Sequence, residues 1–252
     1  AERGSPSPPA SASTEDAASL SAEAVDARLL SLGVDPTPGD PSSSDRRACL
    51  VCVSRPNFWR THRASHPNAK RVKSWMFVHA KYREQLADVV SLAEGTAAGG
   101  EYRQFPALKL AAGKFMKKIV RHSKFEDEQL FRFFKEEVAT RGGVGDEELG
   151  KALEELMKQH AGEEMTRSGT LNKSLEEATE ACAADDNGNI EEEKCSVALK
   201  NVIEALKTYQ EEMLAHLELE EQTLVGRWLG LSTELYGIYR DNYLKFPYSF
   251  MY

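Results

Sequence analysis

The chain has 252 residues and a formal net charge of −8, with 32 Lys or Arg residues against 40 Asp or Glu residues. This length suits one large domain or two small ones. No run of apolar residues approaches the roughly 18 that a membrane span requires, so we expect no membrane span.

The first part of the chain has the composition of a non-globular segment. Residues 1–45 are rich in Ser, Pro, Ala and Gly, and such a segment buries too little apolar area to offset the entropy that it loses on ordering. We therefore expect residues 1–45 to be a disordered or linker segment.

Residues 46–73 are expected to form a basic, irregular flank. The stretch from Arg46 to Arg83 carries ten Lys or Arg residues and no acidic residue. A basic stretch can bind nucleic acid, but no regular nucleic-acid-binding motif accompanies this one. We therefore favour a solvated flank that packs on the acidic remainder, and we expect no nucleic-acid partner.

Apolar residues recur with the helical period in four later segments, and nothing has the pattern of a strand. The predicted helices cover about residues 74–94, 106–140, 146–184 and 191–229. Because the connections between them are short, we predict an all-α fold, an antiparallel up-down four-helix bundle over residues 74–230. The predicted inner faces carry Trp75, His79, Tyr82, Leu86 and Val90; Phe115, Ile119, His122, Glu126, Leu130 and Phe133; Leu149, Leu153, Leu156, His160, Glu164, Leu171 and Leu175; and Val202, Leu206, Tyr209, Met213, His216, Glu220, Leu224 and Trp228.

Each predicted helix carries one histidine on its inner face, and two of these histidines begin a His-x-x-x-Glu motif. Residues four apart lie on one helical face, and buried ionisable groups are costly unless something compensates them. In an antiparallel bundle, with a rise of about 1.5 Å per residue, these groups fall near the same end. We predict a metal centre whose candidate ligands are His79, His122, Glu126, His160, Glu164, His216 and Glu220.

The predicted ligand set indicates which metal and which exogenous ligand to expect. Imidazole and carboxylate together, with no thiolate, favour iron over manganese or zinc. Two carboxylates from different helices can bridge two ions held about 3.5–4 Å apart. Because Glu126 and Glu220 neutralise only half the charge of two divalent ions, we expect the centre to favour an anionic ligand such as peroxide, hydroxide or a third carboxylate. The small-molecule partner that we expect is O₂ or peroxide.

These motifs resemble the hemerythrin-like family, also called the HHE cation-binding domain, over about residues 72–230. The resemblance lies in His79 to Leu86, His122 to Phe131 and His216 to Leu224. It implies an up-down bundle that holds a non-haem di-iron centre. In oxygen-carrying members the third helix supplies two histidines four apart, whereas this chain has His160 followed by Glu164. The resemblance therefore implies binding or sensing of oxygen, iron or a related oxidant rather than reversible oxygen carriage.

Two other functions remain open at this stage. In one, the bundle is a scaffold within a larger complex, and the aromatic tail at residues 231–252 binds a protein partner. In the other, the protein stores or delivers iron. No separate general acid or base is evident, so enzymatic activity stays an open question.

The four cysteines lie in two pairs. Cys49 and Cys52, with His62 and His66, supply the ligand types of a zinc finger, but the spacing between the pairs is shorter than usual, so an irregular segment is favoured. Cys182 and Cys195 flank a polar turn across which they could form a disulfide. Four cysteines in a chain of this size favour an intracellular protein, and we therefore expect free thiols.

Overall fold

The computed structural model describes residues 68–139 and 147–244 of the chain, and it describes the side chains of all of these except residues 163–168. The predicted segment 1–45, most of the basic flank and the end of the aromatic tail therefore lie outside the described residues. The same holds for Cys49, Cys52, His62 and His66, whose possible role in binding zinc stays untested.

Every regular element within the described residues is helical, which confirms the all-α class. The longer helices are α4 (Ala69–Ala98), α5 (Phe105–Phe125), α7 (Glu147–Lys158), α8 (Glu164–Ala181) and α9 (Glu192–Gly230), and a short α10 (Thr233–Ile238) follows. A 3-10 turn, η2 (Tyr102–Gln104), precedes α5. The wider π turns are η3 (Glu126–Phe131), η4 (Phe134–Val138), η5 (Gln159–Glu163) and η6 (Tyr239–Tyr243).

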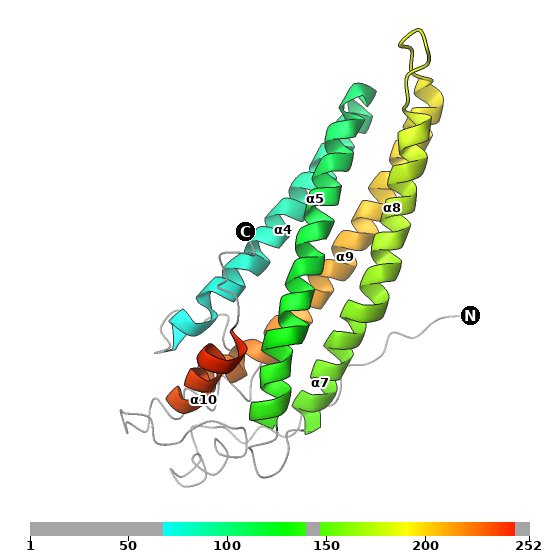
Figure 1. Cartoon of the computed structure of the whole chain (residues 1–252). Helices are drawn as coiled ribbons and strands as arrows, with labels where there is room; N and C mark the ends of the chain where they lie inside the picture. The colour runs from blue at the N-terminus through cyan, green and yellow to red at the C-terminus, as the bar shows by residue number, and fades with distance from the viewer. Residues whose placement is uncertain (1–67, 140–146, 245–252) are drawn as a thin grey trace, which may run out of the picture.

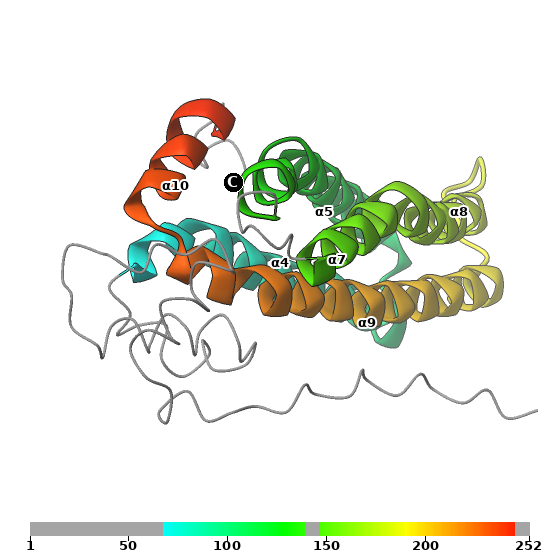
Figure 2. The same ribbon diagram turned by 90° about the horizontal axis from the view of Figure 1, so that it is seen from below.

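The long helices lie side by side, and α7 continues through η5 into α8 (Figure 1). The chain reverses direction between α4 and α5, between α5 and the α7–α8 segment, and between α8 and α9. Helix α4 contacts α5 and α9, and α8 contacts the same two helices from the other side. Helix α10 stands at the end of the molecule opposite the hairpin that joins α8 to α9 (Figure 2).

The predicted inner faces form the core of the protein. Apart from Glu164, whose side chain is not described, every inner-face residue named above is buried. Within the described residues, no helix is both long and apolar enough to cross a bilayer.

Helix α4 begins at Ala69, inside the stretch that was predicted to be an irregular flank. Tertiary contacts explain the longer helix: Val72 is fully buried, the Asn68 amide donates to the backbone oxygen of Leu229 at 2.7 Å, and the Arg71 guanidinium donates to that of Leu231. The first residues of the aromatic tail also fold back, because Tyr239 is buried against Phe133 and Trp228.

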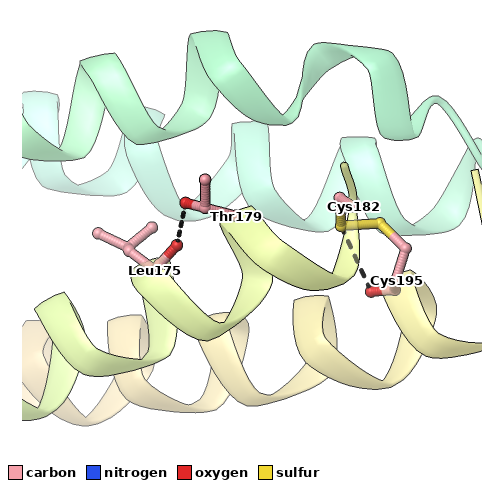
Figure 3. The surroundings of a disulfide bond; sticks show 4 residues. All are labelled: Leu175, Thr179, Cys182 and Cys195. Atoms are coloured by element: carbon pink, nitrogen blue, oxygen red, sulfur yellow. Dashed lines mark hydrogen bonds between the residues drawn. A yellow bond between two sulfur atoms is a disulfide. The ribbon is translucent and has the colours of Figure 1, made fainter. Parts of the chain in front are cut away.

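Cys182 and Cys195 are joined by a disulfide at the base of the α8–α9 hairpin (Figure 3), so the expectation of free thiols was wrong. The antiparallel helices bring the two Cα atoms to 4.7 Å, a separation that a disulfide spans. The turn between them is closed by the Asp185 carboxylate, which accepts from the backbone N–H groups of Asn187 and Asn189. Gly188 lies in this turn at φ 82°, a conformation that favours glycine.

Candidate metal centre

Six of the seven predicted ligand residues meet between the four long helical segments. His79 lies on α4 and His122 on α5, whereas His216 and Glu220 lie on α9. Glu126 is the first residue of η3, and His160 lies in η5. All six are buried, the most exposed of them at 7%. The side chain of Glu164 lies outside the described part of the chain.

One group of possible ligand atoms comes from His79, His122, Glu126 and Glu220, with one atom of each within 4.8 Å of the others. Glu126 Oε1 lies 3.5 Å from His79 Nε2 and 3.2 Å from His122 Nε2. Glu220 Oε2 lies 3.6 Å from His79 Nε2. Three helical segments therefore contribute two imidazoles and two carboxylates to this group.

A second group comes from His160, His216 and Glu220. Glu220 Oε1 lies 3.3 Å from His160 Nε2 and 3.1 Å from His216 Nε2. Glu126 also faces this group, since its Oε2 atom is 3.9 Å from His160 Nε2. Both carboxylates thus turn one oxygen toward each group of histidines.

Wide π turns carry two of the six residues. An α-helix that locally adopts i→i+5 hydrogen bonds bulges and re-aims its side chains, and such turns often occur at functional sites. Glu126 opens one of these turns and His160 lies in another. The 3.6-residue pattern used to predict the helices carries no information on them.

Several nitrogen and oxygen atoms in the centre are buried without a hydrogen-bond partner. Among the described residues these include His79 Nε2, both ring nitrogens of His122, Glu126 Oε2 and both oxygens of Glu220. Each such atom typically costs about 1–3 kcal/mol. A metal ion would satisfy the imidazole nitrogens and carboxylate oxygens together, so the residues present fit a metal centre.

The neighbouring carboxylates raise the pKa values of two of the histidines. Burial disfavours a charge on His79, but the nearby carboxylates of Glu126 and Glu221 raise its pKa to about 9. Burial likewise opposes a charge on His160, but Asp127 and Glu220 raise its pKa to about 11.

The two carboxylates differ from each other in protonation. Burial and the charge of Glu220 raise the pKa of Glu126 to about 7. Burial would also raise the pKa of Glu220, but His216 and His160 hold it well below its usual range. Burial and the charge on His79 lower the pKa of His122 well below its usual value. Protons and a metal ion would therefore compete for the nitrogen and oxygen atoms of the centre.

Three of the four histidines make a further hydrogen bond through Nδ1, which fixes the ring and directs Nε2 into the centre. The partners are Glu221 for His79 at 3.0 Å, Asp127 for His160 at 2.8 Å, and Gln159 for His216 at 2.8 Å. Sequence reasoning did not find these three partners, although each is adjacent in sequence to a predicted ligand.

Aromatic rings line the centre on two sides. The Trp75 indole N–H donates to Glu126 Oε1 at 2.6 Å, and its ring lies 4.0 Å from that of His79. Phe131 stacks on His160 with the ring centroids 5.4 Å apart. These rings exclude water from the imidazoles and carboxylates.

Comparison of the chain with family models, curated proteins and solved structures found no match. Its function is therefore inferred from the geometry of the centre.

Proposed function

We propose that this protein is a hemerythrin-like protein that holds two iron ions in an antiparallel four-helix bundle and binds or senses oxygen, iron or a related small oxidant. The observation that carries the proposal is the position of Glu126 and Glu220, each with one oxygen toward either group of histidines. A carboxylate so placed between two imidazole groups suits a bridge between two ions.

The ligands divide between two ions. His79 and His122 would hold one ion, His160 and His216 would hold the other, and Glu126 and Glu220 would contact both. Two carboxylates offset half of the charge of two divalent ions, and the remainder favours an anionic ligand. Bound iron would supply the one-electron chemistry and the affinity for O₂ or peroxide that none of these side chains has alone.

The third helical segment supports sensing or binding rather than reversible carriage. Oxygen carriers of the family that this chain resembles place two histidines there, and this chain has Glu164 one turn after His160. An additional carboxylate would make the centre more electron-rich. We propose Glu164 as the seventh ligand on the basis of this spacing.

Metal analysis of the purified protein tests the proposal. We expect close to two iron ions per chain and a ligand-to-metal charge-transfer band in the oxidised protein. The Glu220→Gln variant should lose most of this iron, whereas Glu211→Gln should keep it, because Glu211 is an exposed residue on the same helix. Stable protein that takes up no metal on reconstitution would refute the proposal, and labile iron well above two per chain would favour storage instead.

A further inference from the structure

A continuous row of aromatic rings leads from the centre to the surface. The Trp75 ring lies 4.0 Å from His79, and the Trp228 ring lies 5.8 Å beyond Trp75. Tyr239 follows at 5.6 Å from Trp228, and Tyr236 at 6.3 Å from Tyr239. Trp75, Trp228 and Tyr239 are each at most 1% exposed, whereas Tyr236 is only partly buried.

All four rings belong to the residue types that can give up one electron, and this distinguishes the row from ordinary core packing. A second row begins at Tyr82, whose ring lies 5.0 Å from that of His122, but the next ring along it is Phe115. Phenylalanine is far harder to oxidise than tryptophan or tyrosine, so Phe115 interrupts the second row before Tyr209. The row through Trp228 joins redox-active rings from the centre to the partly buried Tyr236 with no phenylalanine between them.

Trp228 is difficult to explain by packing alone. Its indole N–H is buried without a hydrogen-bond partner within the described part of the chain. A phenylalanine would fill much of the same space without burying an unpaired donor, whose burial costs stability. What tryptophan adds at this position is a ring that can be oxidised.

A cation lies against the last ring of the row. The Arg71 guanidinium carbon lies 4.6 Å above the Tyr236 ring, and Lys70 and Lys73 are exposed on the same first turns of α4. This charge suits an anionic electron donor.

We propose that Trp75, Trp228, Tyr239 and Tyr236 form a one-electron path that joins the His/Glu centre to a small anionic reductant at the surface. The proposal rests on the proposed function, since the centre is where the oxidant, a peroxide, reacts. The path carries the oxidising equivalent away from the histidines and carboxylates that hold the metal.

The electrons and protons balance along the path. At the centre, hydrogen peroxide takes up two electrons and two protons, one of each per passage along the path. Each electron is drawn from Trp75, which takes one from Trp228, and Trp228 takes one from Tyr239. The phenol proton that Tyr239 loses balances the proton consumed at the centre. The Tyr239 radical takes an electron and a proton from Tyr236, which takes both from the reductant. With ascorbate as the donor, one hydrogen peroxide and two ascorbate anions give two water molecules and two ascorbyl radical anions.

Radical transfer can be measured without iron, in the full-length chain as purified and after loading with zinc, which has no redox chemistry. Azide radical, generated by pulse radiolysis, oxidises tryptophan, and the absorption bands of tryptophan and tyrosine radicals are followed in time. A Trp59→Phe background leaves only the two tryptophans of the path. We expect the tryptophan radical to decay as the tyrosine radical forms.

Matched variants decide the outcome. Tyr239→Phe should abolish this transfer, whereas Tyr209→Phe should leave it unchanged, because Tyr209 is equally buried but lies beside Phe115. Equal transfer in the two variants would overturn the proposal. Trp228→Phe provides a second test that also removes the unpaired donor, and circular dichroism verifies that each variant is folded.

The iron-loaded protein provides a second readout. After hydrogen peroxide is added without a donor, freeze-quenched samples should show a tyrosyl radical by electron paramagnetic resonance, and ascorbate should quench it. Loss of this signal in Tyr239→Phe would support the path, and an unchanged signal would overturn it. Failure to bind iron would refute the proposed function alone, since the radiolysis result does not depend on iron.

Discussion

Replacement of Glu221 tests whether the hydrogen bonds around the centre determine its affinity for metal. Glu221 is 2% exposed, accepts from Arg83 at 2.7 Å, and lies 3.0 Å from Nδ1 of His79. In Glu221→Ala, the His79 ring would keep a buried Nδ1 without a partner, and the ring would no longer be held in position. Arg83 is 31% exposed and can turn to water, so the main loss falls on His79.

The expected magnitude follows from this single lost contact. Removal of a hydrogen-bond partner of a metal-binding histidine typically weakens metal binding about 10–100-fold. This corresponds to about 1.4–2.8 kcal/mol. Glu221→Gln keeps an acceptor oxygen near Nδ1 and should recover part of the affinity.

The assay is a titration with ferrous iron or zinc in competition with a chelator of known affinity. Gln222→Ala serves as the control, because Gln222 is the next residue on α9 and donates to Glu218 rather than to a histidine. Circular dichroism and thermal melting establish that each variant is folded. If Glu221→Ala binds metal as tightly as Gln222→Ala, then the position of His79 does not depend on Glu221 and the reasoning fails.

Three further predictions concern metal removal, pH and the disulfide. A chelator should lower the melting temperature, and added metal should restore it, because buried atoms of His122 and Glu220 lose their partner; unchanged melting would contradict this. Metal affinity should rise with pH by about tenfold per pH unit for each proton that metal displaces, from Glu126 below about pH 7, from His79 below about pH 9 and from His160 below about pH 11; titrations at several pH values would measure it. Cys195→Ser should lower the free energy of unfolding in urea by about 2–4 kcal/mol but leave the metal content unchanged, since the disulfide lies about 30 Å along α9 from His216.

The burial pattern of the helices could be predicted from the sequence because burial repeats with the helical period. The inner-face residues are buried, and the ligands lie on the same faces because they point into the same interior. The start of α4 could not be predicted in this way, because it depends on contacts of Val72 and Arg71 with distant parts of the chain.

The π turns could not be predicted from a 3.6-residue period, yet they left a trace in the sequence. Leu130 and Phe131 are both fully buried, as are Phe133 and Phe134. Adjacent residues of an α-helix point about 100° apart. Two pairs of adjacent buried residues therefore make the buried face wider than the narrow apolar stripe of an ordinary amphipathic helix. An apolar face that widens directly after a candidate ligand is a signal of such turns.

The hydrogen-bond partners of the histidines follow a rule that the fold makes visible. Asp127 and Glu221 come one residue after a ligand on α5–η3 and α9, whereas Gln159 comes one residue before a ligand on the segment from α7 to α8. The α7–α8 segment runs opposite to α5 and α9 (Figure 1). Reversal of a helix also reverses the sense in which successive side chains rotate about its axis. The residue before a ligand on α7–α8 therefore points to the same rotational side as the residue after a ligand on α5 or α9.

Each partner therefore reaches the histidine of the next helix around the bundle. The segment α5–η3 supplies the partner of the histidine on η5, η5 supplies the partner of the histidine on α9, and α9 supplies the partner of the histidine on α4. The same rule assigns the fourth partner, for His122 on α5, to the residue that precedes His79 on α4. That residue is Val78, whose side chain cannot form a hydrogen bond, and Nδ1 of His122 is buried without a partner within the described residues. The missing fourth partner thus has a cause in the sequence, and His122 is the proposed ligand whose orientation would depend most on a bound metal.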